Sequence, residues 1–472
     1  MSIKSPLFCK KCYSCISQEN NMRHKYLLAT LISLISCSLA AVSQAVVTKN
    51  NFNRLSAWDS GGNIYTAVAQ NRKADYGEAN NRILISKRSP GGTLLWTWKI
   101  TSSAVTFNAA ALKIDSSGNL VFLGSQVTST GQQLLLWTAT SSCTGVYAVT
   151  AGSASEIYEP TDLAIDSGIC VPVGNYKSSS SAPSQGFVMN YNYGGAPFYY
   201  WYRKLFSPQT NTMFSSVAID YSTFNIFVLG ASNTTGSDQT TRLYKLDPAT
   251  GTTLASASEY LGTSQYCSTA KVLLNTAGDV FVVSGIMPPT GTATTVVRRY
   301  TSACAQTWGT NTSNGLQPTD AKLDTAGNIG LSGVAWLSGV PQNNAFNVAR
   351  YDKYLGVLMF QASGTVSGYP TGSATSIDFN SSNDFVLSGV VTDGTHTGFG
   401  LVAFNYWGGK ITDWIYYVAS ASEAAEGCQS VMTAADTVYV TGSIKYSGKM
   451  EQGTIFFQTN YLPYWAWLTV VP

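Results

Sequence analysis

Histidine is nearly absent from this sequence of 472 residues, which contains only His24 and His396. A metal site built from several histidines is therefore excluded, and a Ser-His-Asp triad would depend on His396 alone. The sequence also lacks a phosphate-binding Gly-x-x-x-x-Gly-Lys-Ser/Thr loop and a Gly-x-Ser-x-Gly nucleophile motif in a strand-to-helix setting. These absences remove common hydrolytic and nucleotide-dependent mechanisms, so we expect neither a metal nor a cofactor.

Charged residues are also scarce. They make up 11% of the sequence, against roughly 25% in an average domain, and the formal net charge is only +3. No basic run occurs after residue 45, so we expect no nucleic-acid partner. The same region contains no apolar run of about 18 residues, and we therefore expect no transmembrane span in the mature chain.

Cysteine is limited to nine residues, of which five follow the N-terminal segment. These five are Cys143, Cys170, Cys267, Cys304 and Cys428. An odd number cannot pair completely within one chain. For an oxidising compartment we consider two disulfides, Cys267–Cys304 within one repeat and Cys143–Cys170 between adjacent repeats. The alternative is that these cysteines are buried free thiols.

The N-terminal segment has the pattern of an export signal. A positive stretch begins at Met22, an apolar stretch covers Tyr26–Ala40, and the small residues Ser43–Ala45 suit cleavage after Ala45. The residues before Met22 do not fit a signal peptide, so we expect translation to begin at Met22. The sequence ending at Cys37 resembles the bacterial lipobox, in which the cysteine is lipidated. We expect a secreted or periplasmic protein, or alternatively an outer-membrane lipoprotein anchored through Cys37.

An internal repeat fills the rest of the chain. Residues Ala111–Gly124 form an alternating run, a short turn with Asp, Gly and Asn, and an apolar run closed by Gly. Period-two alternation around such a turn predicts a β-hairpin. Related segments recur at Ala57–Val68, Leu163–Gly174, Ser216–Gly230, Ala270–Gly285, Asp320–Gly333, Thr375–Gly389 and Ser430–Gly442.

Each repeat has a second half of the same kind. After a polar segment comes another apolar run, a Gly-bearing turn and a run that often ends in Trp or Tyr, most clearly in Arg82–Trp98. Each unit therefore holds four short strands, and the closing glycines recur about every 53 residues. Such units are typical of propeller blades. We predict a single all-β domain over residues 46–472, an eight-bladed β-propeller of four-stranded antiparallel blades, preceded by an export signal in residues 1–45. Seven blades is the alternative.

The strand order within a blade predicts which face binds a ligand. If the strand before the Asp-bearing turn is innermost and the Trp-bearing strand outermost, the tight turns share one face and the longer loops share the other. Long loops are expected at Gln70–Asn81, Tyr176–Gln185, Ala335–Phe346 and Val390–Phe399. Because binding residues concentrate on loops held by a rigid scaffold, we expect the ligand on the long-loop face.

Several residues of that face are candidates for catalysis or binding. Glu156 with Glu159, and Glu423 with Glu426, lie in predicted blade-connecting loops, where paired carboxylates hydrolyse glycosides at a suitable separation. The binding candidates are the loop aromatics and the one mature histidine: Tyr76, Tyr176, Tyr266, Trp336 and His396.

Two recurring residue types have structural explanations. The repeated carboxylates are interpreted as turn caps rather than calcium ligands, because repetition spreads them around the ring. They are Asp115, Asp166, Asp220, Asp324 and Asp378. The tryptophans near the outer strands are expected to pack against neighbouring blades.

The segments Ala111–Gly124, Arg82–Trp98 and Asn347–Asp352 resemble the repeats of bacterial secreted β-propeller families, and the resemblance covers nearly all of the mature chain. It implies a propeller fold, and it implies export because those families are mostly surface or secreted proteins. Tyr244–Gly251 also looks like the repeat of quinoprotein dehydrogenases and of the outer-membrane assembly lipoprotein BamB. The other repeats lack the regular Thr-Gly and terminal Trp of that pattern.

The sequence thus predicts an exported, monomeric, non-catalytic binding or scaffold module whose partner is an extracellular or envelope protein or a glycan. Two alternatives remain open. One is an extracytoplasmic glycan-active enzyme that uses the glutamates. The other is a lipidated envelope-assembly factor resembling BamB.

Overall fold

A computed structural model describes most of the compact unit Asn51–Pro472. The described ranges are 55–70, 79–166, 168–193, 198–204, 211–233, 238–263, 266–288, 290–337, 340–417, 424–432, 438–446 and 449–457. All regular elements in these ranges are strands, as predicted for an all-β chain. No described segment is a helix of the length and apolar character that crossing a membrane requires.

The strands form successive antiparallel groups. The first half of the domain contains β1 (Ser56–Trp58), β2 (Ile64–Gln70), β3 (Asn81–Arg88), β4 (Leu94–Ser102); β5 (Thr106–Ile114), β6 (Leu120–Val127), β7 (Gln132–Ala139), β8 (Tyr147–Ala151); β9 (Ile157–Asp166), β10 (Ile169–Lys177), β11 (Gln185–Asn192), β12 (Phe198–Lys204); and β13 (Asn211–Ile219), β14 (Ile226–Asn233), β15 (Asp238–Leu246), β16 (Thr253–Thr263). The second half contains β17 (Tyr266–Leu274), β18 (Val280–Met287), β19 (Thr294–Tyr300), β20 (Gln306–Thr312); β21 (Leu316–Leu323), β22 (Ile329–Leu337), β23 (Val340–Tyr351), β24 (Leu358–Gly364); β25 (Thr371–Phe379), β26 (Phe385–Thr392), β27 (Thr397–Phe404), β28 (Lys410–Tyr417); and β29 (Ala424–Met432), β30 (Val438–Tyr446), β31 (Lys449–Phe457).

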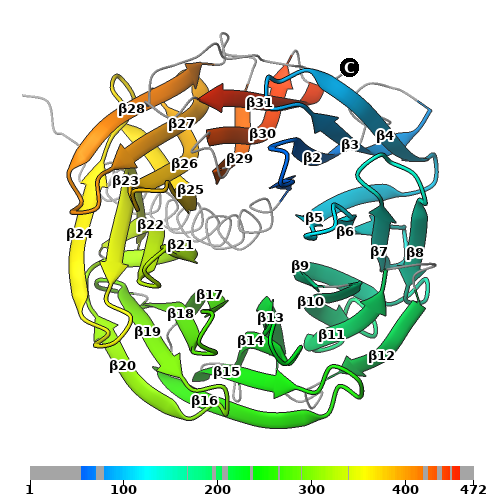
Figure 1. Cartoon of the computed structure of the whole chain (residues 1–472), viewed down its shortest axis with the longest axis horizontal. Coiled ribbons are helices and arrows are strands. Elements are labelled where there is room, and N and C mark those ends of the chain that lie inside the picture. The colour runs from blue at the N-terminus through cyan, green and yellow to red at the C-terminus, as the bar shows by residue number, and fades with distance from the viewer. Residues whose placement is uncertain are drawn as a thin grey trace, which may run out of the picture. The chain divides into compact units, whose positions relative to one another are not determined.

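Within each group the strands pair in chain order. Figure 1 shows the first strand of each group near a central axis and the last strand at the periphery, so the groups are arranged as propeller blades. The predicted fold class and strand order are therefore confirmed. Single parallel bridges also join two pairs of neighbouring blades, between Gln132 and Ile157 and between Asn344 and Gly372.

The number of blades stays a prediction. The last described group holds the three strands β29, β30 and β31. Both segments that could complete this blade and close the ring, Val46–Asn53 and Tyr464–Val470, lie outside the described residues.

Two of the predicted long loops are mostly strand. Strands β22 and β23 pair as far as Leu337 and Val340, so most of the segment Ala335–Phe346 belongs to a hairpin. Strand β26 continues to Thr392 and β27 begins at Thr397, which shortens the second loop in the same way. The polar residues that suggested a loop, such as Asn343 and Asn344, are exposed strand residues. Backbone pairing therefore extends beyond the apolar part of these strands.

The glycine that closes each hairpin has a packing role. Opposite this glycine, the innermost strands β5, β9, β13, β21 and β25 each carry a β-bulge. The bulge brings the backbone of that strand so close that a Cβ atom at Gly124 would overlap the carbonyl oxygen of Asn108. A Cβ atom at Gly389 would overlap the carbonyl oxygen of Ser373 in the same way. The repeat therefore keeps glycine where two backbones approach closely.

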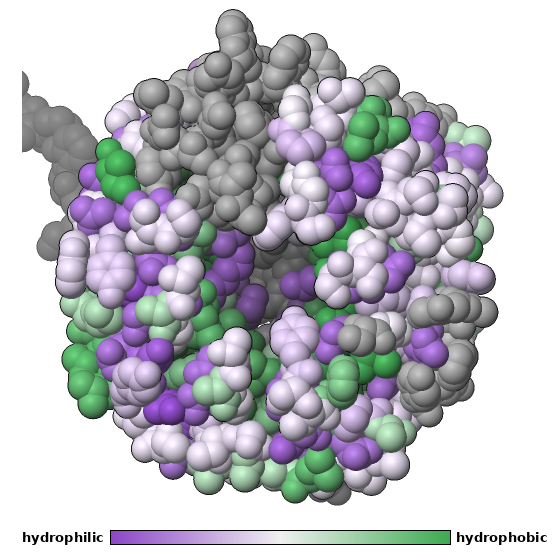
Figure 2. All heavy atoms as spheres, viewed as in Figure 1, coloured by the Kyte–Doolittle hydropathy of each residue, from purple (hydrophilic) through white to green (hydrophobic). Residues whose placement is uncertain are grey.

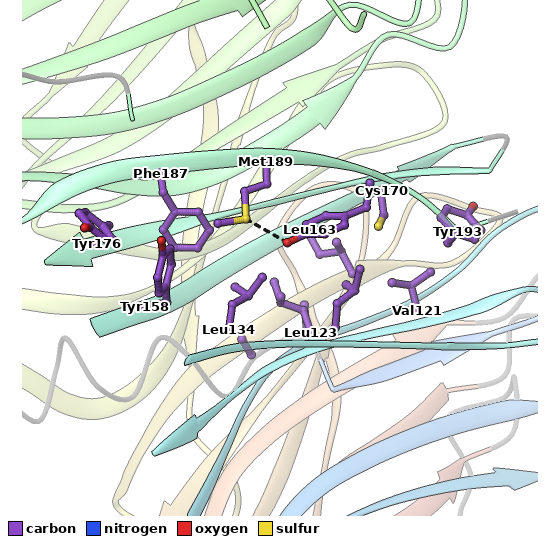
Figure 3. Close-up of a cluster of buried hydrophobic side chains, with 14 residues drawn as sticks. Val121, Leu123, Leu134, Tyr158, Leu163, Cys170, Tyr176, Phe187, Met189 and Tyr193 are labelled. Atoms are coloured by element: carbon purple, nitrogen blue, oxygen red, sulfur yellow. Dashed lines mark hydrogen bonds between the residues drawn. The ribbon is translucent and has the colours of Figure 1, made fainter. Parts of the chain in front are cut away.

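Apolar clusters between facing sheets hold the blades together. One cluster joins β6 and β7 to β9, β10 and β11, and Figure 3 shows Leu123 and Leu134 facing Leu163 and Phe187. Each of these four side chains is at most 1% exposed. Burial of one such side chain stabilises the fold by about 1.5–3 kcal/mol. The core is thus a series of contacts between blades.

Three cysteines are free thiols in different clusters. Cys170 lies in the cluster of Figure 3, Cys143 packs against the preceding cluster, and Cys304 lies in a cluster of β14, β15 and β17–β19. The considered disulfide Cys143–Cys170 is therefore not formed, because its two residues pack in separate blade interfaces. The considered disulfide Cys267–Cys304 is not formed either, since Cys304 is free; the side chain of Cys267 lies outside the described residues.

The buried thiols should resist alkylation in the native protein. Burial raises the pKa of Cys170, and it raises the pKa of Cys304 to about 11. The reactive thiolate is therefore scarce at a pH of about 8. Without reductant, iodoacetamide should label neither residue before unfolding and both after it, as measured by peptide mass spectrometry. A disulfide-linked peptide containing either residue in a non-reduced digest would contradict this assignment.

Aromatic residues of the outermost strands dock on the next blade. Three indole N–H groups donate to backbone carbonyls in the turn between the third and fourth strands of the following blade: Trp96 to Ser141 at 3.2 Å, Trp201 to Pro248 at 2.8 Å and Trp308 to Lys353 at 3.2 Å. Gly251 and Gly356 in two of these turns have φ of 65° and 66°, and a Cβ atom there would collide with the docked indole. The packing role predicted for these tryptophans is confirmed.

Polar contacts link the innermost strands. Lys271 pairs with Asp320 at 3.0 Å and Lys322 with Asp378 at 2.7 Å, each across neighbouring blades. Figure 2 shows that the centre of the ring is hollowed and that hydrophilic residues border the hollow. The turn-cap prediction is therefore corrected for Asp378, whose carboxylate pairs with Lys322. It is confirmed for Asp115, which accepts the backbone N–H groups of Ser117 and Asn119, and likewise for Asp220 and Asp324.

Candidate binding surface

The structure gives Tyr176 and Glu156 a packing role. Tyr176 is only 3% exposed and its ring lies 5.0 Å from that of Tyr158. Its hydroxyl donates to Glu156 Oε1 at 2.7 Å, while Glu156 Oε2 accepts the backbone N–H of Ser153 at 2.7 Å. Both carboxylate oxygens of Glu156 therefore stabilise the connection between two blades. Glu159 lies half-buried in β9.

Trp336 and His396 are held within local structure. Trp336 is half-buried at the end of β22, and its backbone N–H donates to the carbonyl oxygen of Gly315 at 2.6 Å. His396 Nδ1 lies 2.9 Å from Asp393 Oδ2 in the turn between β26 and β27. The hydrogen bonds from His396 and Thr395 lower the pKa of Asp393 to about 2. These contacts tie His396 to its own turn and Trp336 to the connection between β20 and β21.

The other candidates from the sequence cannot be placed with their side chains. Cys37, Tyr76 and Glu423 lie outside the described residues. The side chains of Tyr266 and Glu426 do so as well, although their backbones belong to β17 and β29.

Exposed large apolar side chains gather on the face that carries the tight turns, which we call the turn face. Of the fifteen such residues in the described part of the chain, twelve lie in these turns or in the first residues of the strands that follow. The twelve are Leu94, Leu95, Tyr147, Tyr221, Phe224, Leu254, Tyr354, Leu355, Val357, Met359, Trp407 and Ile411. Among the described residues, exposed large apolar side chains therefore lie mainly on the turn face.

Tyr221 in the β13–β14 turn is 76% exposed, and the other most exposed members belong to two neighbouring blades. Trp407 is 76% exposed, Leu355 72% and Tyr354 63%. Together with Val357 and Ile411 they form what we call the apolar turn cluster, in the β23–β24 turn, the β27–β28 turn and the start of β28. Exposed apolar groups of this size cost solubility, and they commonly mark interaction sites.

The β23–β24 turn is rigidly held. The carboxylate of Asp352 accepts the backbone N–H groups of Tyr354 and Leu355 at 2.8 and 2.7 Å. Gly356 presses against the indole of Trp308 from the preceding blade. The exposed side chains therefore project from a fixed backbone. Because this backbone is already ordered, the turn loses less conformational entropy when a partner binds.

The β27–β28 turn is held in a similar way. Asn405 accepts the backbone N–H of Trp407 at 3.0 Å, and the ring of Tyr406 lies 3.6 Å from the guanidinium carbon of Arg350. Gly408 packs on Phe360 of the preceding blade. This contact joins the β27–β28 turn to strand β24, which follows the β23–β24 turn.

The chain matches no protein-family model and no curated protein. Among solved structures it is similar to the quinohemoprotein alcohol dehydrogenase from Comamonas testosteroni, with 10% identity, coverage of 86% of this chain and 75% of the other, and a TM-score of 0.49. It is also similar to prolyl oligopeptidase B from Galerina marginata, with 8% identity, coverage of 88% and 58%, and a TM-score of 0.45. A KlHsv2 variant with a Gly-Ser linker in place of one loop gives 6% identity, coverage of 77% and 98%, and a TM-score of 0.43. Similarities this weak carry no information about function.

Proposed function

We propose that this protein is an exported, non-catalytic binding propeller that recognises a protein partner through its apolar turn cluster. The observation that supports this role is the concentration of exposed aromatic and aliphatic side chains on the turn face. The ligand surface expected from the sequence was the opposite face. Its described aromatic candidates, Tyr176 and Trp336, are buried or half-buried.

The chemistry of the cluster favours a protein over a glycan. Leu355, Val357 and Ile411 offer aliphatic surface without hydrogen-bonding groups, and Trp407 and Tyr354 are the residue types that anchor protein interfaces. Of the nearby cations, Lys410 pairs with Asp413 at 2.6 Å. Lys353 donates to the neutral carbonyl oxygen of Ala326 and lies 4.8 Å from the centre of the Tyr354 ring. The cluster therefore presents an apolar surface bordered by one ammonium group without a carboxylate partner among the described residues.

A site-specific photocrosslinking experiment tests the proposal. A photoreactive phenylalanine analogue replaces Trp407 in the full chain, expressed in its native cells, and Tyr260 is replaced in a matched control. Tyr260 is 58% exposed near the end of β16, on the opposite face. We expect one discrete crosslinked protein from position 407 and none from position 260. The Leu355→Ser substitution should reduce that crosslink at least tenfold.

Three results would count against a protein partner on the turn face. One is equal crosslinking from both positions, and another is a crosslink that survives Leu355→Ser. The third is a crosslink only to a second copy of the same chain, which would assign the cluster to self-association. Membrane fractionation of a Cys37→Ala variant tests separately whether the binding propeller is lipid-anchored.

A further inference from the structure

An open depression lies on the turn face, two blades away from the apolar turn cluster along the ring. It has a volume of about 430 Å³ and lies between the β1–β2 turn and the β5–β6 turn. Trp58 and Ile114 supply its apolar lining, and serine residues supply much of the rest: Ser60, Ser116, Ser117 and Ser141.

Trp58 departs from the repeat. It is the last paired residue of β1, opposite Ile64, and directly precedes the turn residue Asp59. The corresponding residues before the turns of other blades are mostly aliphatic, as at Ile114, Ile219 and Leu323, and phenylalanine occurs there at Phe379. Ile114 packs against an apolar cluster, whereas Trp58 belongs to none of the clusters among the described residues. The half-exposed indole lines the depression.

The carboxylates at the depression are engaged in their own turns. Asp59 accepts the backbone N–H groups of Gly61 and Asn63 and the hydroxyl of Tyr65, at 3.0, 2.9 and 2.9 Å. Lys87 lies 3.5 Å from Asp59 and donates to the carbonyl oxygen of Ser141 at 3.1 Å.

Asp115 is engaged in the same way. Besides its turn amides it accepts the hydroxyl of Tyr193 at 2.9 Å. No group of three or more metal-ligating side chains occurs among the described residues. Lys87 offsets the charge of Asp59, so the two carboxylates leave about one negative charge at the site, which disfavours an anion. Their existing hydrogen bonds leave the carboxylates poorly suited to coordinate a cation. The depression therefore favours a neutral ligand.

The groups left for a ligand are an indole and hydroxyls. Ser60, Ser116 and Ser117 are exposed, and no hydrogen bond of their hydroxyl groups to another described residue is observed. A pyranose ring has an apolar C–H face that packs on an indole and equatorial hydroxyls that exchange hydrogen bonds with serine. Neither feature requires a net charge on the ligand.

We propose that this depression is a carbohydrate subsite in which a neutral pyranose stacks on Trp58 and hydrogen-bonds to the serine hydroxyls. The site shares the turn face with the apolar turn cluster, but it uses other blades and does not depend on the proposed protein partner. An aromatic platform with a few hydroxyl groups in a shallow hollow suits weak binding of one or two sugar units.

Titration with defined oligosaccharides tests the subsite. The probes are cellotetraose, mannotetraose, chitotetraose and tetragalacturonate, measured with the full chain by isothermal calorimetry and ligand-observed NMR. We expect at least one neutral tetrasaccharide to bind with a Kd below about 10 mM and tetragalacturonate to bind more weakly. Trp58→Ala should weaken that binding at least tenfold, Trp58→Phe should retain most of it, and Trp407→Ser should leave it unchanged.

The proposal fails if no neutral tetrasaccharide binds in this range, or if tetragalacturonate binds best. It also fails if Trp58→Ala leaves binding intact, or if Trp407→Ser weakens binding as much as Trp58→Ala does. Thermal unfolding of each variant shows whether lost binding reflects lost folding, and Trp58→Phe preserves an aromatic ring in case the alanine variant does not fold. Failure here leaves the photocrosslinking result at Trp407 unaffected.

Discussion

Replacing Gly389 by alanine should lower the free energy of unfolding by about 4 kcal/mol or prevent folding, which places it among the most damaging single substitutions. The added Cβ atom would overlap the carbonyl oxygen of Ser373 and crowd the backbone of Ala374. These are backbone atoms of β25 held by the bulged pairing with β26. No side-chain rotation relieves such a clash, so either β25 must move away or the pairing must break.

Gly91 provides the matched control for this substitution. It lies exposed in the β3–β4 turn, its φ is not positive, and a Cβ atom there would meet only Ser89 Oγ at 3.9 Å. Gly91→Ala should therefore change stability by less than about 1 kcal/mol, with stabilisation expected because alanine restricts the unfolded chain. Urea unfolding followed by tryptophan fluorescence measures both variants. Similar midpoints for the two would show that the close approach at Gly389 is easily relaxed.

The closing glycine illustrates what the sequence predicts well. Its recurrence revealed the hairpins, and the alternation around it gave the strand order from the axis to the periphery, as the structure confirms. The repeats also predicted the docking of Trp96, Trp201 and Trp308 on the next blade. Local patterns of period two and turn chemistry are sufficient for these features, because every blade repeats them.

The exposed apolar surface was less visible in the sequence, for a physical reason. Polar residues at Asn343 and Asn344 indicate a loop in the sequence, but at the end of a blade they are also compatible with an exposed hairpin. Whether a side chain is exposed depends on which neighbouring blade packs against it, and the sequence does not show these contacts between blades directly. In the sequence, the apolar turn cluster is indicated only by aromatic residues near glycine in the turns, Tyr354 before Gly356 and Trp407 before Gly408.

The buried ion pair of Arg350 and Asp324 should be intolerant of single substitutions. Both side chains are fully buried, and Arg350 also donates to the carbonyl oxygen of Tyr406 at 3.2 Å. Asp324→Asn keeps an oxygen that caps the turn, as Asn380 does in the next blade, where it accepts the backbone N–H of Asp384 at 2.8 Å. The variant nevertheless leaves the guanidinium without its counter-charge. We expect a loss of about 3–5 kcal/mol in the free energy of unfolding.

The double variant Asp324→Asn/Arg350→Met separates the loss of the ion pair from the burial of an uncompensated charge. Methionine fills most of the same space between Phe385 and Tyr406 without a charge. If the uncompensated guanidinium causes the damage, the double variant should be more stable than Asp324→Asn alone by at least about 1 kcal/mol. Urea unfolding of the two single variants and the double variant at one pH completes the cycle. Additive losses would show instead that each residue acts independently, and would place the contribution of Arg350 in its contact with Tyr406 rather than in the ion pair.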